Sequence, residues 1–104
     1  MPSKVTPLAE LTIPTAGTAV QANANPIQAA AVAFEADKDN TGYIYIGLSD
    51  VSSNKYIAAL KKGEQLEFEA SIIHGNTDAY IVSDYYIDTE TNGNTVHISY
   101  QHRR

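Results

Sequence analysis

The chain lacks cysteine and tryptophan altogether, and its four prolines all lie at or before Pro26. Without cysteine, neither a disulfide framework nor a thiolate metal site can form. No apolar run approaches the length of a membrane span, and the start Met1-Pro2-Ser3-Lys4 lacks the apolar stretch of a signal peptide. We therefore expect a protein made in a cytoplasm, with no membrane partner and with a single core in its 104 residues.

Basic residues are scarce as well. The chain has 7 lysines and arginines against 12 aspartates and glutamates, which gives a formal net charge of -5. Binding to a phosphate backbone needs a clustered basic face. The adjacent basic pairs are Arg103-Arg104 at the end of the chain and Lys61-Lys62, which Gly63 and Glu64 follow in a turn pattern. These observations exclude nucleic acid as an expected partner.

Tyrosine is the aromatic residue that the chain does have, with 7 copies against 2 phenylalanines. Tyrosine combines apolar contact area with a hydroxyl group that needs a partner, which suits half-exposed strand faces and interfaces. Two uses stay open: the tyrosines pack on a thin sandwich, or they contact a partner. The candidates for partner contact are Tyr43, Tyr45, Tyr85 and Tyr86.

Residues 1–26 differ in composition from the rest and are predicted to form an extended N-terminal arm. Proline fixes φ and lacks an amide donor, so this segment favours extended or edge-strand backbone. We expect the arm to order against another body, such as a neighbouring subunit; the alternative is a mobile tail. Its candidate partner-binding residues are Pro7, Leu8, Leu11, Ile13 and Pro14.

Residues 27–104 show short alternating segments separated by turn clusters, the pattern of an antiparallel β-sandwich or barrel. The predicted strands cover residues 29–36, 43–47, 64–70, 79–82, 85–87 and 95–101. Their predicted inward side chains include Val32, Phe34, Ala36, Ile44, Ile46, Leu66, Phe68, Ala70, Val96, Ile98 and Tyr100. No segment shows a convincing amphipathic helix longer than two turns, so the predicted fold class is all-β.

The connections are less uniform. Asn92-Gly93 lies between alternating segments and predicts a β-hairpin. Residues 71–78 are predicted to be a loop that turns at Gly75-Asn76. Residues 56–60 are compatible with a strand or with a short helical turn.

No set of residues predicts catalysis, a metal site or a cofactor. Asp37, Asp39 and Gly42 follow the start of a calcium-binding loop, but Leu48 stands where that loop needs a bidentate glutamate. His97 falls opposite the face of Val96 and Ile98, towards solvent, and lacks ligand spacing to the other histidines. No nucleophile is paired with a base by motif. We therefore expect a protein that is not an enzyme.

An ordered set of turn motifs runs through the chain from Thr15 onward. It comprises TAGTAVQ at residues 15–21, DKDNTGYIYIG at 37–47, SDVS at 49–52, the Lys62-Gly63-Glu64 turn, Tyr80-Ile81-Val82, and the Gly93 turn before the closing strand. This set resembles a family of small virion proteins of tailed bacteriophages. Lys62 departs from the family's usual proline, and residues 71–77 add length to a connection that is tighter in the family.

The resemblance implies a virion structural protein, and a capsid cement or decoration protein on the outer surface of the head fits an arm joined to one domain. The implied partners are the major capsid protein and further copies of the chain in a homotrimer. The implied location is the capsid surface after synthesis in the host cytoplasm. The alternatives are a tail- or head-fibre-associated protein and a carbohydrate-binding module used in host adhesion.

Overall fold

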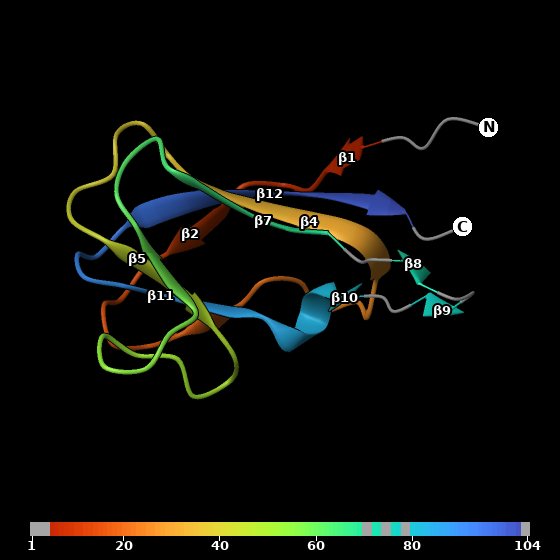
Figure 1. Ribbon diagram of the computed structural model, residues 1–104. Helices are drawn as coiled ribbons and strands as arrows, with labels where there is room; N and C mark the ends of the chain where they lie inside the picture. Colours follow the sequence, from red (N-terminus) through yellow and green to blue (C-terminus); the bar gives the residue numbers. More distant parts are fainter. Residues whose placement is uncertain (1–4, 70–71, 74–75, 78–79, 103–104) are drawn as a thin grey trace.

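The computed structural model describes residues 5–69, 72–73, 76–77 and 80–102, and it confirms the predicted all-β sandwich (Figure 1). Two antiparallel sheets pack against each other around one core. The larger sheet contains β1 (Val5–Pro7), β2 (Leu11–Ile13), β4 (Gln28–Ala36), β7 (Gln65–Glu69), β10 (Tyr80–Ile81) and β12 (Asn94–His102). The smaller sheet contains β3 (Val20–Gln21), β5 (Ile44–Gly47), β6 (Ala58–Leu60) and β11 (Tyr86–Thr89). One 3-10 turn, η1 (Val82–Asp84), precedes β11.

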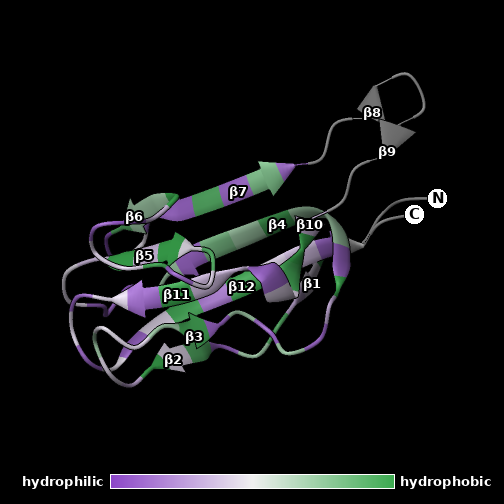
Figure 2. Ribbon diagram, turned by 90° about the horizontal axis from the view of Figure 1, so that it is seen from below, coloured by the Kyte–Doolittle hydropathy of each residue, from purple (hydrophilic) through white to green (hydrophobic). Residues whose placement is uncertain are grey.

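The two long strands β4 and β12 form the centre of the larger sheet and pair with each other, with Ile98 opposite Phe34. Their side chains alternate as the sequence predicts, since Val32 and Phe34 are buried and Glu35 is partly exposed. Strand β7 lies on the other side of β4 and shows the same alternation, which Figure 2 displays as bands of hydropathy along the strand. Period-two alternation therefore identified the faces of all three strands.

The core lies between the sheets, and both contribute to it. Phe34 is fully buried at its centre, where it makes edge-to-face contacts with Phe68 and Tyr85 at centroid distances of 6.1 and 5.8 Å. Such aromatic pairs contribute about 0.5–1.5 kcal/mol beyond the area that they bury. The other buried members include Ile13, Val32, Ile44, Ile46, Val82, Ile87, Val96 and Ile98.

From Val5 onward, the N-terminal segment contributes short strands that pair within its own chain. Strands β1 and β2 pair with β12, and β3 pairs with β11. The segment thus contributes to both sheets, and its residue Ile13 has no exposed surface. No break in the fold coincides with the expected boundary at residue 26, because Ala22 and Ala29 on either side of it belong to the same core.

The turn at Asn92-Gly93 does not form the expected hairpin. It leads from β11 in the smaller sheet to β12 in the larger one, so the prediction of a hairpin was wrong. The physical reason is that other strands occupy the edges of β11 and β12, while the Gly93 N–H donates to the Ile13 carbonyl at 2.9 Å. Gly93 still has a positive φ of 85°, a conformation that glycine adopts without steric cost.

Two other connections cross between the sheets at the same end of the molecule: residues 37–43 join β4 to β5, and residues 61–64 join β6 to β7 (Figure 1). The ambiguous residues 56–60 supply β6, a strand. The expected loop at 71–78 contains a short ladder in which β8 (Ile72–Ile73) pairs with β9 (Asn76–Thr77). The expected turn residue Gly75 lies outside the described residues, as does Ala70, an expected core residue.

Candidate interaction surface

The connection between β5 and β6, residues 48–57, is anchored by its own hydrogen bonds. The Val51 N–H donates to the Leu48 carbonyl at 2.9 Å, and Ser52 and Lys55 exchange backbone bonds of 2.9 and 3.1 Å. Val51 is buried and lies directly over Gly47, where a side chain would collide with it. The loop is therefore held in one conformation against the end of β5.

This anchored loop presents apolar side chains to solvent. Leu48 is 52% exposed, Tyr56 47% and Ile57 50%, and we call these three residues the apolar patch. The Ile57 N–H donates to the Ile46 carbonyl at 2.7 Å, which holds Ile57 beside the end of β5, where Leu48 follows. The sequence predicted only that residues 56–60 form a strand or a short helical turn, and none of the three was predicted to contact a partner.

A row of tyrosines crosses the outer face of the smaller sheet and ends at the patch. The rings of Tyr43 and Tyr45 stack with centroids 6.4 Å apart, and Tyr45 lies 5.2 Å from Tyr56. Tyr45 is buried beneath its neighbours, so it is not exposed for partner contact as expected. Desolvation, with repulsion from Glu90, raises the pKa of the Tyr45 phenol above its ordinary value. Tyr43 and Tyr56 form the accessible part of the row.

The other two candidate tyrosines separate into a core residue and a surface residue. Tyr85 stacks on Phe68 at 5.4 Å and belongs to the packing around the core, where burial raises the pKa of its phenol. Tyr86 points the other way and helps line a pocket of about 490 Å³. The other lining residues of that pocket are Gln21, Leu48, Ser49, Ser83 and Asp84.

The candidate residues of the N-terminal segment also divide by exposure. Leu8 and Leu11 are half-buried against the core, and Ile13 is completely buried in it. Pro7 and Pro14 keep exposed positions. Of these five residues, Leu8, Leu11 and Ile13 therefore pack within the chain's own sandwich.

The calcium-like segment after β4 is an Asx turn. The Asp37 carboxylate accepts a hydrogen bond from the Asp39 N–H at 3.0 Å and one from His97 Nε2 at 2.7 Å. The hydrogen bond from His97 is the main cause that lowers the pKa of Asp37. His97 lies on the face opposite Val96 and Ile98 and is partly exposed, as expected, and its ring is bonded to Asp37. In the described part of the chain, no group of three or more His, Asp or Glu side chains could hold a metal ion.

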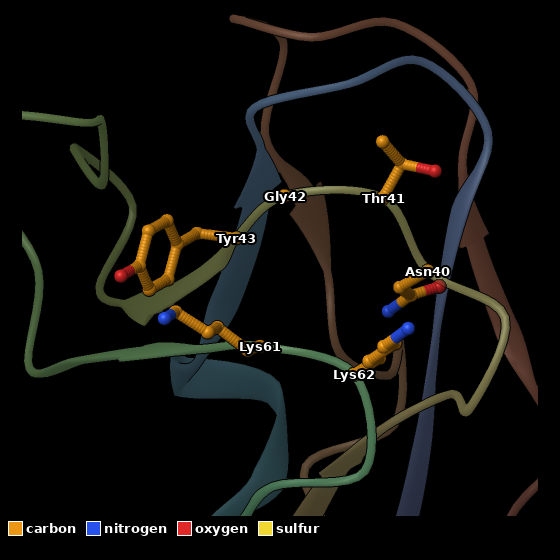
Figure 3. Close-up of a pocket in the computed structure, with 6 residues that line it drawn as sticks. All are labelled: Asn40, Thr41, Gly42, Tyr43, Lys61 and Lys62. Atoms are coloured by element: carbon orange, nitrogen blue, oxygen red, sulfur yellow. The ribbon is translucent and has the colours of Figure 1, made fainter.

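A pocket of about 310 Å³ lies where two of the crossing connections face each other (Figure 3). Residues 40–43 form one wall, and Lys61 and Lys62 form the other. The Lys61 ammonium group lies 5.5 Å from the centre of the Tyr43 ring, within the range of a cation–π interaction. The sequence showed the two lysines as a turn, and nothing in it indicated that residues 40–43 would lie opposite them.

Comparison with known proteins identifies no relative. No protein-family model, no curated protein and no solved structure matches this chain. Across the residues that the structure describes, no helix is long and apolar enough to cross a membrane.

Proposed function

We propose that this chain is a non-enzymatic structural protein of a tailed-phage virion, namely a capsid cement or decoration protein. It binds the outer surface of the head, contacts the major capsid protein and stabilises adjacent capsomers. Copies of the chain associate as a homotrimer, and the protein reaches the capsid surface after synthesis in the host cytoplasm. The resemblance of the ordered turn motifs to small phage virion proteins supports the virion setting.

The apolar patch is the observation that carries the proposal. In the described residues, the large exposed apolar side chains are Val5 and the three members of the patch, so three of them gather around one loop. Contiguous exposed apolar side chains mark surfaces that become buried against a partner. Tyr56 adds an aromatic ring of the kind that often dominates interface energetics.

The patch is also arranged for binding without a large loss of entropy. The Ser52–Lys55 bridge and the packing of Val51 over Gly47 order the loop before a partner arrives. Ordering an interface loop on binding costs free energy, and a loop that is already ordered avoids that cost. This property suits a protein that must contribute stability to a shell through a modest contact area.

A second surface offers charge complementarity to a basic region of a shell. The outer face of the larger sheet holds a groove of about 270 Å³, lined by the small side chains of Ala31 and Ala33 and by Glu67 and Glu69 of β7. Carboxylates on such a face accelerate association with a positive surface and help to select it. The overall net charge of -5 acts in the same direction.

The test uses phage heads that lack this protein, incubated with the purified chain. We expect the chain to bind these heads in many copies and to raise their resistance to heat. The double variant Leu48→Ser/Ile57→Thr should bind about tenfold more weakly, since interface residues of this type contribute 1 kcal/mol or more each. Ala9→Ser/Ala24→Ser is the control, because both alanines are exposed and neither belongs to the apolar patch or lines the groove of the larger sheet. Wild-type protein that neither binds nor protects the heads would overturn the proposal.

A carbohydrate-binding module used in host adhesion is the second candidate function, and the Tyr86 pocket favours it. An aromatic ring lies there beside the carboxylate of Asp84 and the hydroxyl groups of Ser49 and Ser83. A sugar ring stacks on an aromatic face while polar groups at the edge bind its hydroxyl groups. A glycan array should then give a signal that Tyr86→Ala removes. An array without any signal eliminates this candidate.

A further inference from the structure

The four lysines between β4 and β7 differ in how their charges are neutralised. Lys38 pairs with Asp39 at 3.0 Å, and Lys55 pairs with Asp50. Lys61 and Lys62 form no ion pair with any residue that the structure describes. Both line the pocket of about 310 Å³. In an acidic protein, two ammonium groups without a counter-ion thus face one concave site.

Two acidic side chains at the turns around the pocket already bind backbone amides. Glu64 accepts a hydrogen bond from the Lys61 N–H at 2.7 Å, and Glu90 accepts one from the Tyr43 N–H at 3.1 Å. These bonds hold the carboxylates at the turns that they stabilise. The two ammonium groups therefore keep their capacity to bind an external anion.

The wall opposite the lysines is rigid. The side-chain amide of Asn40 is buried and bonded to the backbone of Thr95, and Asn94 bonds both backbone groups of Thr41 at 3.0 and 2.8 Å. Gly42 has a φ of 73°, and a side chain there would collide with Glu90. This wall cannot relax into the pocket, so the space stays open.

Tyr43 positions one of the two charges. Its ring lies beneath the Lys61 ammonium group, and Figure 3 shows the Lys61 side chain beside that ring while Lys62 extends towards Asn40. A cation–π contact at an exposed site contributes about 0.5–1 kcal/mol, enough to favour one position of a flexible side chain. The Lys61 ammonium group is thereby held beside Tyr43, on the side of the pocket away from the Lys62 ammonium group.

From this arrangement we propose that the pocket binds a small ligand through an oxyanion, a carboxylate or phosphate group held between Lys61 and Lys62. The volume of about 310 Å³ accommodates a ligand of the size of a monosaccharide. The ammonium groups supply charge-assisted hydrogen bonds to the oxyanion. This site is separate from the apolar patch, so its failure would leave the proposed capsid role untouched.

Titration of the isotope-labelled protein by NMR tests the proposal, with glucuronate, glucose 6-phosphate, inorganic phosphate and neutral glucose as probes at constant ionic strength. We expect the anionic probes to shift the amide signals of residues 40–43 and 61–62, and glucose to leave them unchanged. Tighter binding of glucose 6-phosphate than of phosphate identifies a sugar-borne group as the source. Equal affinity identifies the free ion, and both results support an oxyanion site.

Matched variants separate the site from general electrostatics. Lys61→Gln/Lys62→Gln should weaken binding about tenfold or more, because it removes both charge-assisted bonds. Lys38→Gln/Lys55→Gln removes the same charge from paired lysines and should leave the affinity unchanged. Tyr43→Leu should weaken binding severalfold. Tyr43→Phe keeps the aromatic ring and should bind with the affinity of the wild-type protein. Two results would overturn the proposal: amide signals of residues 40–43 and 61–62 that do not respond to the anionic probes, or an equal loss of affinity in the two double lysine variants.

Discussion

The side-chain amide of Asn40 hydrogen-bonds both backbone groups of Thr95: its Nδ2 donates to the Thr95 carbonyl, and its Oδ1 accepts from the Thr95 N–H, each at 2.8 Å. One side chain thus takes the place of a neighbouring strand at the start of β12. It ties the connection after β4 to the far end of the sequence. Because Asn40 is buried, water cannot replace these bonds if they are lost.

Asn40→Ala should therefore destabilise the fold by about 2 kcal/mol, since it removes the partner of the Thr95 N–H and leaves the Thr95 carbonyl with the Asp37 N–H alone. The measurement is the free energy of unfolding from urea titration. Asn54→Ala is the matched control, because Asn54 is exposed in the β5–β6 loop and its loss should change stability by less than about 0.5 kcal/mol. Equal effects of the two changes would contradict the structural role of Asn40.

Alternation along the sequence predicted most of the sandwich, because a strand with one buried face must repeat with a period of two. It identified the faces of β4, β7 and β12 correctly. It could not say which strands pair, since pairing depends on contacts between distant segments. Asn92-Gly93 illustrates this limit: a local turn signal is the same whether the chain returns in one sheet or crosses to the other. The N-terminal segment is a second case, because its prolines indicate extended backbone but not its neighbour.

Ile13→Ala tests how firmly the N-terminal segment belongs to the domain. Ile13 is completely buried, so the change should cost about 2–5 kcal/mol through lost burial and the cavity left behind. The measurement is again urea unfolding. Pro14→Ala, at the adjacent exposed position, should alter stability by less than about 0.5 kcal/mol. If Ile13→Ala were as mild as Pro14→Ala, the segment would not be part of the core in solution.

Acid should weaken the link between Asp37 and His97. Because the hydrogen bond from His97 holds the folded-state pKa of Asp37 below its ordinary value of 3.8, the ionised carboxylate adds stability above that value. This stability is lost as the pH falls through the folded-state pKa. Asp37→Asn should consequently lower the urea midpoint at about pH 5.5 and have a smaller effect at about pH 2.5.

The partner residue provides the control for this pH dependence. In a His97→Gln background, which removes the main cause of the lowered pKa of Asp37, the effect of Asp37→Asn should lose most of its dependence on pH. An Asp37→Asn effect that is the same at both pH values in the wild-type background would show that the hydrogen bond contributes nothing to stability.

The candidate sites were harder to predict than the fold. Tyr43 and Tyr86 are partly exposed, because strand alternation places them opposite the buried Ile44 and Ile87, and their contact with a partner stays a prediction. Tyr45 was expected to be exposed for the same reason, yet the rings of Tyr43 and Tyr56 cover it. The apolar patch and the lysine pocket depend on loops, whose conformations follow from long-range contacts rather than from periodicity. One signal in the sequence could have indicated the apolar patch: Tyr56 and Ile57 are large apolar residues that directly follow the polar residues 52–55.

Gly47→Ala tests whether the packing of the loop against β5 holds the apolar patch in place. An added Cβ would lie 2.8 Å from Val51 Cγ2, closer than such atoms can approach, so Val51 and the loop must move. Overpacking of this kind costs about 1–3 kcal/mol, which urea unfolding would measure. Val51→Ala removes Cγ2, the nearer of the two Val51 atoms, and keeps Cβ at 3.0 Å, so the double variant should be less destabilised than the sum of the two single changes, by about 0.5 kcal/mol or more. Simple addition of the two effects would mean that the loop does not pack on Gly47, and the patch would then lack its support.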